Sequence, residues 1–212
     1  MAATGEGAAA PRERISRDDI LDIARRQFAQ NGYRGTNLGQ VSDELGVTRQ
    51  AIYYYFPKKH DVLAGLFERF FAVLESAVET AAASESEPGA RFGAMLRAHV
   101  ETVASDPELS SVFLSEGHGN LPPAPAAAVQ SRRKAYNDKF VQAYTQGVAA
   151  GQLASDVRPR VAVGLLLGAA NWVFRWYDPK GRMTPTEFAT VAERFLANGF
   201  SAKGSSPGPR QR

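Results

Sequence analysis

The sequence predicts an all-α fold, and three observations support this class. Apolar residues recur at helical spacing along most of the 212-residue chain, and the alternating pattern of a strand is poor throughout. Residues that favour helix starts (Ser16, Thr48) and helix ends (Gly32, Gly46, Gly151) flank these segments. A hydrophobic fraction of 44% is also enough to build a core.

Three short helices are predicted in the N-terminal part of the chain. Ser16 is the N-cap candidate of the first helix, which Asn31-Gly32 ends. The second helix covers Leu38–Leu45, and Thr48 can cap a third that runs to about Tyr55. The apolar stripe of the first helix comprises Ile20, Ile23, Ala24 and Phe28.

Six further helices are predicted in the rest of the chain. Pro88 suits the first turn of a helix, and Asp106-Pro107 begins a new one. Gly151 and Asp178-Pro179 each end a helix. The predicted ranges are 59–83, 88–105, 107–115, 125–150, 158–177 and 185–198.

The second and third predicted helices have the pattern of a helix-turn-helix. Val41 and Leu45 lie one turn apart on an apolar face, and Val47 and Ile52 return to the core. Gly46 between them can adopt the left-handed conformation that a tight turn needs. In this motif the second helix enters the major groove of DNA.

Residues 15–66 resemble the TetR family of one-component transcriptional repressors. Two positions depart from the usual family pattern, because Tyr55 replaces a histidine and Lys58 replaces the serine that commonly follows the proline. The resemblance implies a three-helix DNA-binding domain, followed by a six-helix domain for ligand binding and dimerisation. The matching stretches are Gly32-Tyr33, Gly35-Thr36, Leu45–Thr48, Ile52–Lys59 and Asp61–Leu63.

The expected organisation has four parts. Residues 1–14 form a disordered arm, 15–60 the DNA-binding domain, 61–200 the ligand-binding and dimerisation domain, and 201–212 a disordered tail. Residues 12–60 hold nine Lys and Arg against six Asp and Glu, whereas residues 61–200 hold 13 against 15. This asymmetry favours a polyanionic partner for the N-terminal part.

The third predicted helix and its flanks supply the candidate DNA contacts. Arg49 suits guanine and Gln50 suits adenine, because their side chains match the edges of those bases. Tyr53 or Tyr54 can contact a thymine methyl group or a phosphate, and the resemblance implies that Lys59 binds phosphate, with Lys58 beside it. The hydroxyl groups and nearby helix N-termini of two threonines also suit phosphate. These two residues are Thr36 and Thr48.

Several neighbours of these residues have simpler interpretations. Phe56 and one of the three tyrosines at 53–55 are expected in the core, because a short helix must bury one face. Arg25 and Arg26 are expected on an ordinary solvated face. Arg12, Arg14 and Arg17 are candidates for the DNA backbone or the minor groove.

Residues 171–185 resemble TetR regulators of fatty-acid, sterol and related acyl-CoA catabolism, which implies a CoA thioester as effector. Arg175 and Trp176 are then expected near the pocket, and Arg132, Arg133 or Lys134 near phosphates. Two alternatives remain: the tryptophans are core or interface residues, or the ligand is hydrophobic and drug-like, as for a regulator of efflux. The remaining candidates for an apolar cavity are Phe92, Met95, His99, Phe113, Leu114 and Trp172.

The eighth predicted helix, 158–177, is apolar around most of its circumference and must be buried on all sides. We therefore expect it to form, with the ninth helix (185–198), a four-helix bundle across a two-fold axis. The alternative is a purely intramolecular core. A homodimer places two recognition helices about 34–36 Å apart and requires a near-palindromic operator.

Composition and motifs also exclude several classes. The chain has no cysteine and three scattered histidines, which argues against a metal site. It lacks the common motifs of hydrolases, nucleotide-binding enzymes and metalloproteases, so we expect no catalysis and no cofactor. Neither a secretory signal nor a membrane span is present, which indicates a cytoplasmic protein without a membrane partner. The rival interpretation is a helical protein-interaction module.

Overall fold

The computed structural model describes residues 15–116 and 118–200, and within them it contains nine α-helices, two 3₁₀ turns and no strand. The all-α prediction is therefore confirmed. The 3₁₀ turns are His118–Asn120 and Trp172–Arg175. The α-helices are α1 (Arg17–Gly35), α2 (Leu38–Leu45), α3 (Arg49–Tyr55), α4 (Lys59–Ala83), α5 (Pro88–Ser105), α6 (Pro107–Glu116), α7 (Pro123–Ala149), α8 (Pro159–Asn171) and α9 (Pro185–Phe200).

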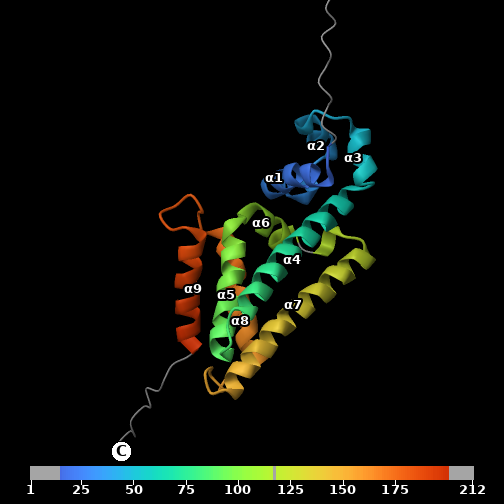
Figure 1. Ribbon diagram of the computed structural model, residues 1–212. Helices are drawn as coiled ribbons and strands as arrows, with labels where there is room; N and C mark the ends of the chain where they lie inside the picture. The colour runs from blue at the N-terminus through green and yellow to red at the C-terminus, as the bar shows by residue number, and fades with distance from the viewer. Residues whose placement is uncertain (1–14, 117, 201–212) are drawn as a thin grey trace, which may run out of the picture.

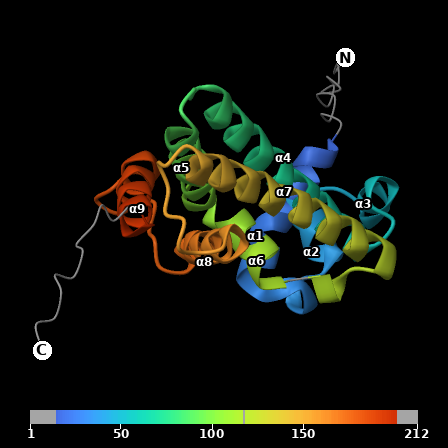
Figure 2. The same ribbon diagram turned by 90° about the horizontal axis from the view of Figure 1, so that it is seen from below.

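The helices form a head and a body that share α4 (Figure 1). Helices α1–α3 form the head, and α4 runs from the head into the body, where α5, α6 and α7 pack against it and α9 packs against α5. Helix α9 lies at one edge of the body, with α8 next to it (Figure 2). The predicted arm and tail, together with Arg12 and Arg14, lie outside the described residues.

Local capping interactions set the boundaries of the head helices. The Ser16 hydroxyl accepts a hydrogen bond from the Asp19 amide (3.1 Å), and Thr48 Oγ1 accepts one from the Ala51 amide (3.3 Å). Gly32 (φ +68°) interrupts α1 where the sequence predicts its end, and the helical segment resumes briefly after the kink. Gly46 (φ +65°) has the left-handed conformation expected between α2 and α3.

One continuous core holds the head together. Ile20, Phe28, Val41, Ile52 and Phe56 are almost fully buried, and each such side chain stabilises the fold by roughly 1.5–3 kcal/mol. They come from α1, α2, α3 and the turn after α3. Because α2 and α3 are each too short to be stable alone, packing between the helices fixes the head.

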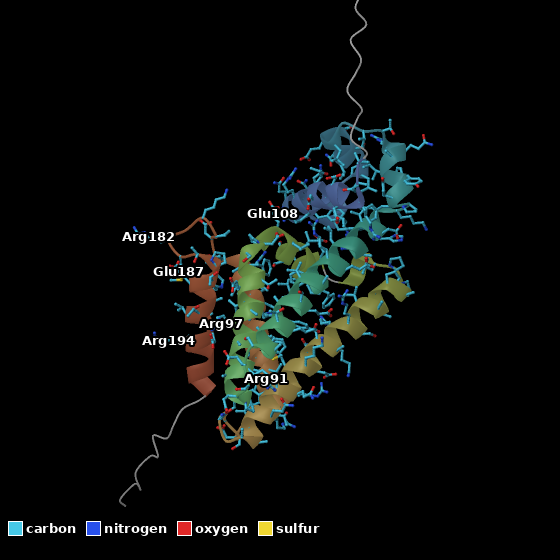
Figure 3. The ribbon with its side chains drawn as sticks, in the orientation of Figure 1. Arg91, Arg97, Glu108, Arg182, Glu187 and Arg194 are labelled. Atoms are coloured by element: carbon cyan, nitrogen blue, oxygen red, sulfur yellow. The ribbon has the colours of Figure 1, made fainter. Side chains whose placement is uncertain are left out.

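Arg25 joins the head to the body, which corrects the prediction of a solvated face. Its guanidinium contacts the carboxylates of Asp106 and Glu108 at the start of α6, at 2.5 and 3.4 Å. Glu108 lies where head and body meet (Figure 3). Arg26 instead binds Glu44 of α2 within the head. The sequence could not reveal the Arg25 contact, because its partners are about 80 residues away.

Two boundaries in the body differ from the prediction. Helix α7 begins at Pro123, two residues early, because proline is well suited to the first turn of a helix. Helix α8 ends at Asn171, and the chain continues as the 3₁₀ turn Trp172–Arg175 instead of a helix to Tyr177. The change of helix type turns the side chains after Asn171 away from the direction expected for a continuous helix.

Candidate DNA-binding surface and effector cavity

Helix α3 presents its polar side chains to solvent at the end of the head. Arg49 and Gln50 are exposed, and Tyr54 is 82% exposed. Tyr53 is also exposed, whereas Tyr55 points inward and donates a hydrogen bond from its hydroxyl to the Ile15 carbonyl (2.7 Å). The exposed face thus carries the donors needed to read base edges, while Ile52 anchors the opposite face in the core.

Arg49 lies against the start of α2. A Cβ atom added to Gly39 would come within 2.7–2.9 Å of three atoms of the Arg49 guanidinium group. Gly39 therefore provides the space in which this side chain lies across the two helices of the motif. Helices α2 and α3 therefore pack closely at this contact between Gly39 and Arg49.

Thr36 is placed differently from the prediction. It is buried, and its hydroxyl donates to the carbonyls of Gln27 (3.0 Å) and Gly32 (2.9 Å). These bonds close the kinked end of α1. Thr36 is therefore a structural residue in this state, because its hydroxyl faces the protein backbone and not the solvent.

Lys59 also faces the protein and not the solvent. Its ammonium group donates to the carbonyls of Tyr33 (2.6 Å) and Thr36 (2.9 Å) and lies 4.3 Å from the centre of the Tyr33 ring. Burial lowers the pKa of Lys59, and the nearby Glu116 carboxylate partly opposes this shift. Lys59 thus ties the first turn of α4 to the segment between α1 and α2. Lys58 remains exposed.

Replacing Lys59 with Met is expected to lower the melting temperature without changing the salt dependence of DNA binding. The two carbonyls then have no charged donor, whereas the number of phosphates that the protein neutralises stays the same. Lys58→Met is the matched control, for which we expect an unchanged melting temperature and a salt slope smaller by about 0.9 for each phosphate that is no longer neutralised. If Lys59→Met instead keeps the wild-type melting temperature and shows a smaller salt slope, Lys59 binds a phosphate as the sequence predicts.

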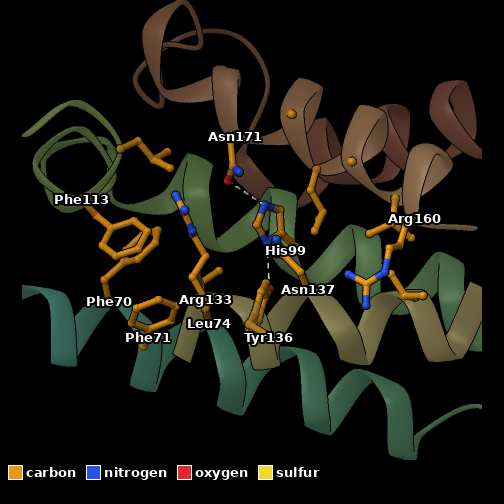
Figure 4. A pocket seen from close by; sticks show the side chains of 16 residues that line it. Phe70, Phe71, Leu74, His99, Phe113, Arg133, Tyr136, Asn137, Arg160 and Asn171 are labelled. Carbon is orange, nitrogen blue, oxygen red and sulfur yellow. Dashed lines mark hydrogen bonds between the residues drawn. The ribbon is translucent and has the colours of Figure 1, made fainter. Parts of the chain in front are cut away.

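A cavity of about 470 Å³ lies inside the body between α4, α5, α6, α7 and α8 (Figure 4). One wall is aromatic: the ring centre of Phe113 lies 4.4 Å from that of Phe70 and 4.9 Å from that of Phe71. Two cationic residues, Arg133 and Arg160, line the cavity and are exposed. Its other lining residues are Leu74, His99, Leu114, Tyr136, Asn137, Val141, Val163, Gly164, Leu167, Gly168 and Asn171.

His99 is the polar centre of this cavity wall. Its Nδ1 lies 2.8 Å from the Tyr136 hydroxyl oxygen, and its Nε2 lies 3.1 Å from Asn171 Oδ1. Burial lowers the pKa of His99 to about 4, so the ring is neutral at physiological pH. Burial also raises the pKa of Tyr136, which keeps its hydroxyl protonated.

We expect His99 to reduce stability at mildly acidic pH. The unfolded state, with a histidine pKa near 6.5, binds a proton that the folded state binds only near pH 4. The free energy of unfolding should therefore fall by about 3 kcal/mol as the pH drops from 6.5 to 4. Urea unfolding at pH 7 and 4.5 tests this: His99→Gln should lose less stability than the wild type, and equal losses would contradict it.

Three of the eight predicted ligand residues line the cavity: His99, Phe113 and Leu114. Phe92 packs instead against Phe140 and Tyr144, because α7 covers the first half of α5. Met95, from the same half of α5, lines a separate hollow beside α4 and α7. Neither residue lines this cavity, and the sequence could not show this because spacing along α5 does not reveal where α7 lies.

The predicted residues after α8 also lie outside the cavity. Trp172 and Trp176 are 60% and 62% exposed, and the Arg175 guanidinium lies 5.5 Å from the Trp172 ring centre. Arg175 lines a small hollow between α1 and α6. The 3₁₀ turn that follows α8 is the physical reason, since it redirects these side chains outward.

A basic hollow adjoins the cavity and shares Arg133, Asn137 and Arg160 with it. Its other lining residues include Lys134, which pairs with Asp138 (2.8 Å). Arg132 is directed elsewhere, because it forms two hydrogen bonds with the Glu75 carboxylate (2.8 and 3.0 Å). Of the three predicted phosphate ligands, only Arg133 and Lys134 therefore face this hollow.

Sequence reasoning missed several cavity residues, including Phe70, Tyr136, Arg160 and Asn171. One of them had a visible signal: Asn171 is the single polar residue that interrupts the apolar run 161–174. A polar side chain at such a position usually has a buried partner, here His99. The others became recognisable only when the helices were packed together.

An apolar face remains uncovered on α8 and α9. Leu165 is 61% exposed and Phe195 is 78% exposed, and both belong to stripes with helical spacing. Exposed apolar stripes of this kind mark interaction surfaces. Among the residues of these two helices whose burial is described, the other large exposed apolar side chains are Val161 and Val191.

The fold and the exposed recognition helix define a DNA-binding regulator of the helix-turn-helix class. Residues 20–66 match the model of bacterial regulatory proteins of the tetR family, and residues 85–200 match the tetracyclin repressor-like C-terminal domain. The chain belongs to the TetR family of transcriptional regulators.

Known relatives agree with this assignment. The transcriptional repressor KstR2 of Rhodococcus jostii (strain RHA1) is 23% identical over 85% of this chain and 87% of its own length. A TetR/AcrR family regulator from Thermobifida fusca is 35% identical, with a TM-score of 0.67 over 86% of this chain and 97% of that one. The structure of AibR in complex with isovaleryl coenzyme A and operator DNA is 25% identical, with a TM-score of 0.76 over 87% and 98%.

The described part of the chain offers neither a membrane span nor a metal site. No helix there is long and apolar enough to cross a membrane. Among the same residues, no group of three or more His, Cys, Asp or Glu side chains could hold a metal ion.

Proposed function

We propose that this protein is a repressor that binds a near-palindromic operator as a homodimer and is released by an acyl-CoA thioester. The observation that carries the proposal is the pairing of an exposed recognition helix with an internal cavity that opens onto a basic hollow. The first part supports DNA binding, and the second supports control by an amphiphilic anion.

We assign the DNA-binding domain to residues 15–60. Arg49, Gln50, Tyr53 and Tyr54 are the proposed base-reading or groove contacts, with Thr48 and Lys58 at phosphates. Thr48 is exposed at the start of α3 and Lys58 is exposed at the start of α4, which supports this assignment. The proposed boundary with the ligand-binding domain, residues 61–200, falls in the first turn of α4, so one helix belongs to both domains.

We assign dimerisation to α8 and α9. Val161 and Leu165 lie one turn apart on α8, α9 adds Val191 and Phe195, and Trp172 is exposed directly after α8. Two copies of this face can pack as a four-helix bundle about a two-fold axis. The dimer then supplies the second recognition helix that a palindromic operator requires.

The cavity supports an effector with an apolar part and a phosphorylated part. Phe70, Phe71 and Phe113 suit an acyl group, whereas Arg133 and Arg160 suit phosphates where the cavity meets the basic hollow. The complex of AibR with isovaleryl coenzyme A is consistent with this class of effector in a relative.

Helix α6 is the proposed link between effector and DNA. Phe113 on α6 lines the cavity, and Glu116, one turn later, accepts a hydrogen bond from the Tyr33 amide of the head (2.9 Å). An effector that displaces Phe113 therefore shifts a helix that holds the head in place. Release requires only a difference in affinity between the two states, typically ~1–3 kcal/mol of coupling.

A gel-shift assay on the DNA upstream of the protein's own gene tests the proposal. We expect the wild type to bind a near-palindrome there and an acyl-CoA to release it, while the free acid does not. Arg133→Ala with Arg160→Ala should keep operator binding and lose most of the response to acyl-CoA. Equal release by acid and thioester would remove the CoA assignment, and release only by hydrophobic drug-like compounds would favour the efflux alternative.

A further inference from the structure

Three polar side chains in the cavity wall are joined in a row by hydrogen bonds, and a donor and an acceptor can be assigned to each bond. Tyr136 of α7, His99 of α5 and Asn171 of α8 are joined by hydrogen bonds of 2.8 and 3.1 Å (Figure 4). All three residues line the cavity. They come from three different helices, so their alignment is a property of the packed body.

The direction follows from the atoms involved. Asn171 presents its oxygen to His99 Nε2, and because an amide oxygen can only accept, Nε2 carries the proton. The ring is neutral, so Nδ1 is unprotonated and accepts a hydrogen bond from the Tyr136 hydroxyl. The three groups thus form one consistent chain of donors and acceptors with the Asn171 amide in this orientation.

This orientation leaves the Asn171 amide nitrogen as a donor at the cavity wall. Among the described residues, none accepts a hydrogen bond from it. Figure 4 shows the rings of Phe70, Phe71 and Phe113, with Arg133 beside them, on one side of His99 and Arg160 on the other. The Asn171 donor therefore lies between the aromatic wall and Arg160.

We propose that the Asn171 amide donates a hydrogen bond to the carbonyl oxygen of the effector and selects carbonyl-containing acyl groups, with His99 and Tyr136 as positioning residues. This assignment rests on the proposed function, because it takes the cavity as the effector site. The acyl chain extends toward the aromatic wall, and the remainder of the effector extends toward Arg160. Asn171 is then a specificity-determining residue, because an effector without the carbonyl leaves its donor unpaired.

A pair of CoA compounds isolates this hydrogen bond. Hexanoyl-CoA and S-hexyl-CoA differ only in the carbonyl oxygen, and calorimetric titration of the full chain measures both affinities. We expect the wild type to bind hexanoyl-CoA about 3- to 10-fold more tightly, the usual net effect of one hydrogen bond. Asn171→Leu should bind both compounds within about 2-fold of each other, with little change for S-hexyl-CoA.

Two further variants separate the role of the Asn171 donor from the role of the residues that position it. Asn137→Leu, which alters another asparagine of the same cavity, should keep the wild-type preference. Tyr136→Phe should reduce the preference, because without the hydroxyl His99 loses the hydrogen bond that positions its ring against Asn171. A preference that survives in Asn171→Leu overturns the assignment.

The outcomes also distinguish this inference from the proposed function. Equal binding of both CoA compounds by the wild type overturns the role of Asn171 and leaves the effector class standing. Binding of hexanoate but of neither CoA compound overturns both, and it indicates a carboxylate held by a cation such as Arg133. Failure of all three to bind also overturns both.

Discussion

Leu165→Glu is expected to convert the dimer to a monomer and to weaken operator binding by at least about 100-fold, because the two recognition helices no longer bind as one unit. Leu165 projects from the exposed apolar stripe of α8. In a two-fold interface each substitution meets its own copy, so two carboxylates would be buried close together without partners. Sedimentation velocity and a gel shift on the same sample measure the two effects.

Val73→Glu is the matched control for this substitution. Val73 is an exposed apolar residue of similar size on α4, where it lines a hollow between α4 and α5 and lies outside the proposed α8–α9 face. It should remain dimeric and bind the operator like the wild type. A dimeric Leu165→Glu variant with normal operator affinity would contradict the assignment of the interface to α8 and α9.

Arg49→Ala is expected to reduce operator affinity by about 2–6 kcal/mol in the dimer and to relax the preference for one base in each half-site. A bidentate contact to a base is worth about 1–3 kcal/mol, and the dimer makes it twice. The side chain is exposed and lies against Gly39 at the start of α2, so it is accessible for the proposed contact. Binding to operators with single base changes measures both effects.

Arg34→Ala provides the comparison for the removal of charge alone. Arg34 is exposed at the end of α1, and its substitution removes one positive charge from the same head. We expect it to weaken binding to all sequences alike, because an interaction with phosphate carries no base preference. If Arg49→Ala behaves in the same way on every operator variant, Arg49 does not read a base.

The helix-turn-helix could be located from sequence because its signals are local. The cap at Thr48, the left-handed Gly46 and the apolar spacing of Val41 and Ile52 all act within a few residues. Such signals fix where a helix begins and ends whatever the rest of the chain does. Helices α2 and α3 therefore begin and end close to the predicted residues.

The roles of individual side chains were less predictable. Thr36 and Lys59 have the chemistry to bind phosphate, yet both are engaged with the backbone at the end of α1. Arg25 resembles a solvated residue in sequence and pairs with the body in the structure. A hydrogen-bond donor or a charged group can bind a ligand when it is exposed, but neighbouring residues in the fold decide whether it is already engaged with the protein.

The candidate effector cavity shows most clearly which features the sequence predicts and which features only the packing of the helices decides. Sequence identified His99 and Phe113 as candidates, but Tyr136 and Arg160 joined them only through the packing of α7 and α8 against α5. The sequence by itself determined most of the helices, the helix-turn-helix and the family, because these follow from short-range spacing and from turn chemistry. The tertiary structure alone decided which side chains share the cavity and which hydrogen bonds orient Asn171, because those contacts join residues 37 and 72 positions apart along the chain.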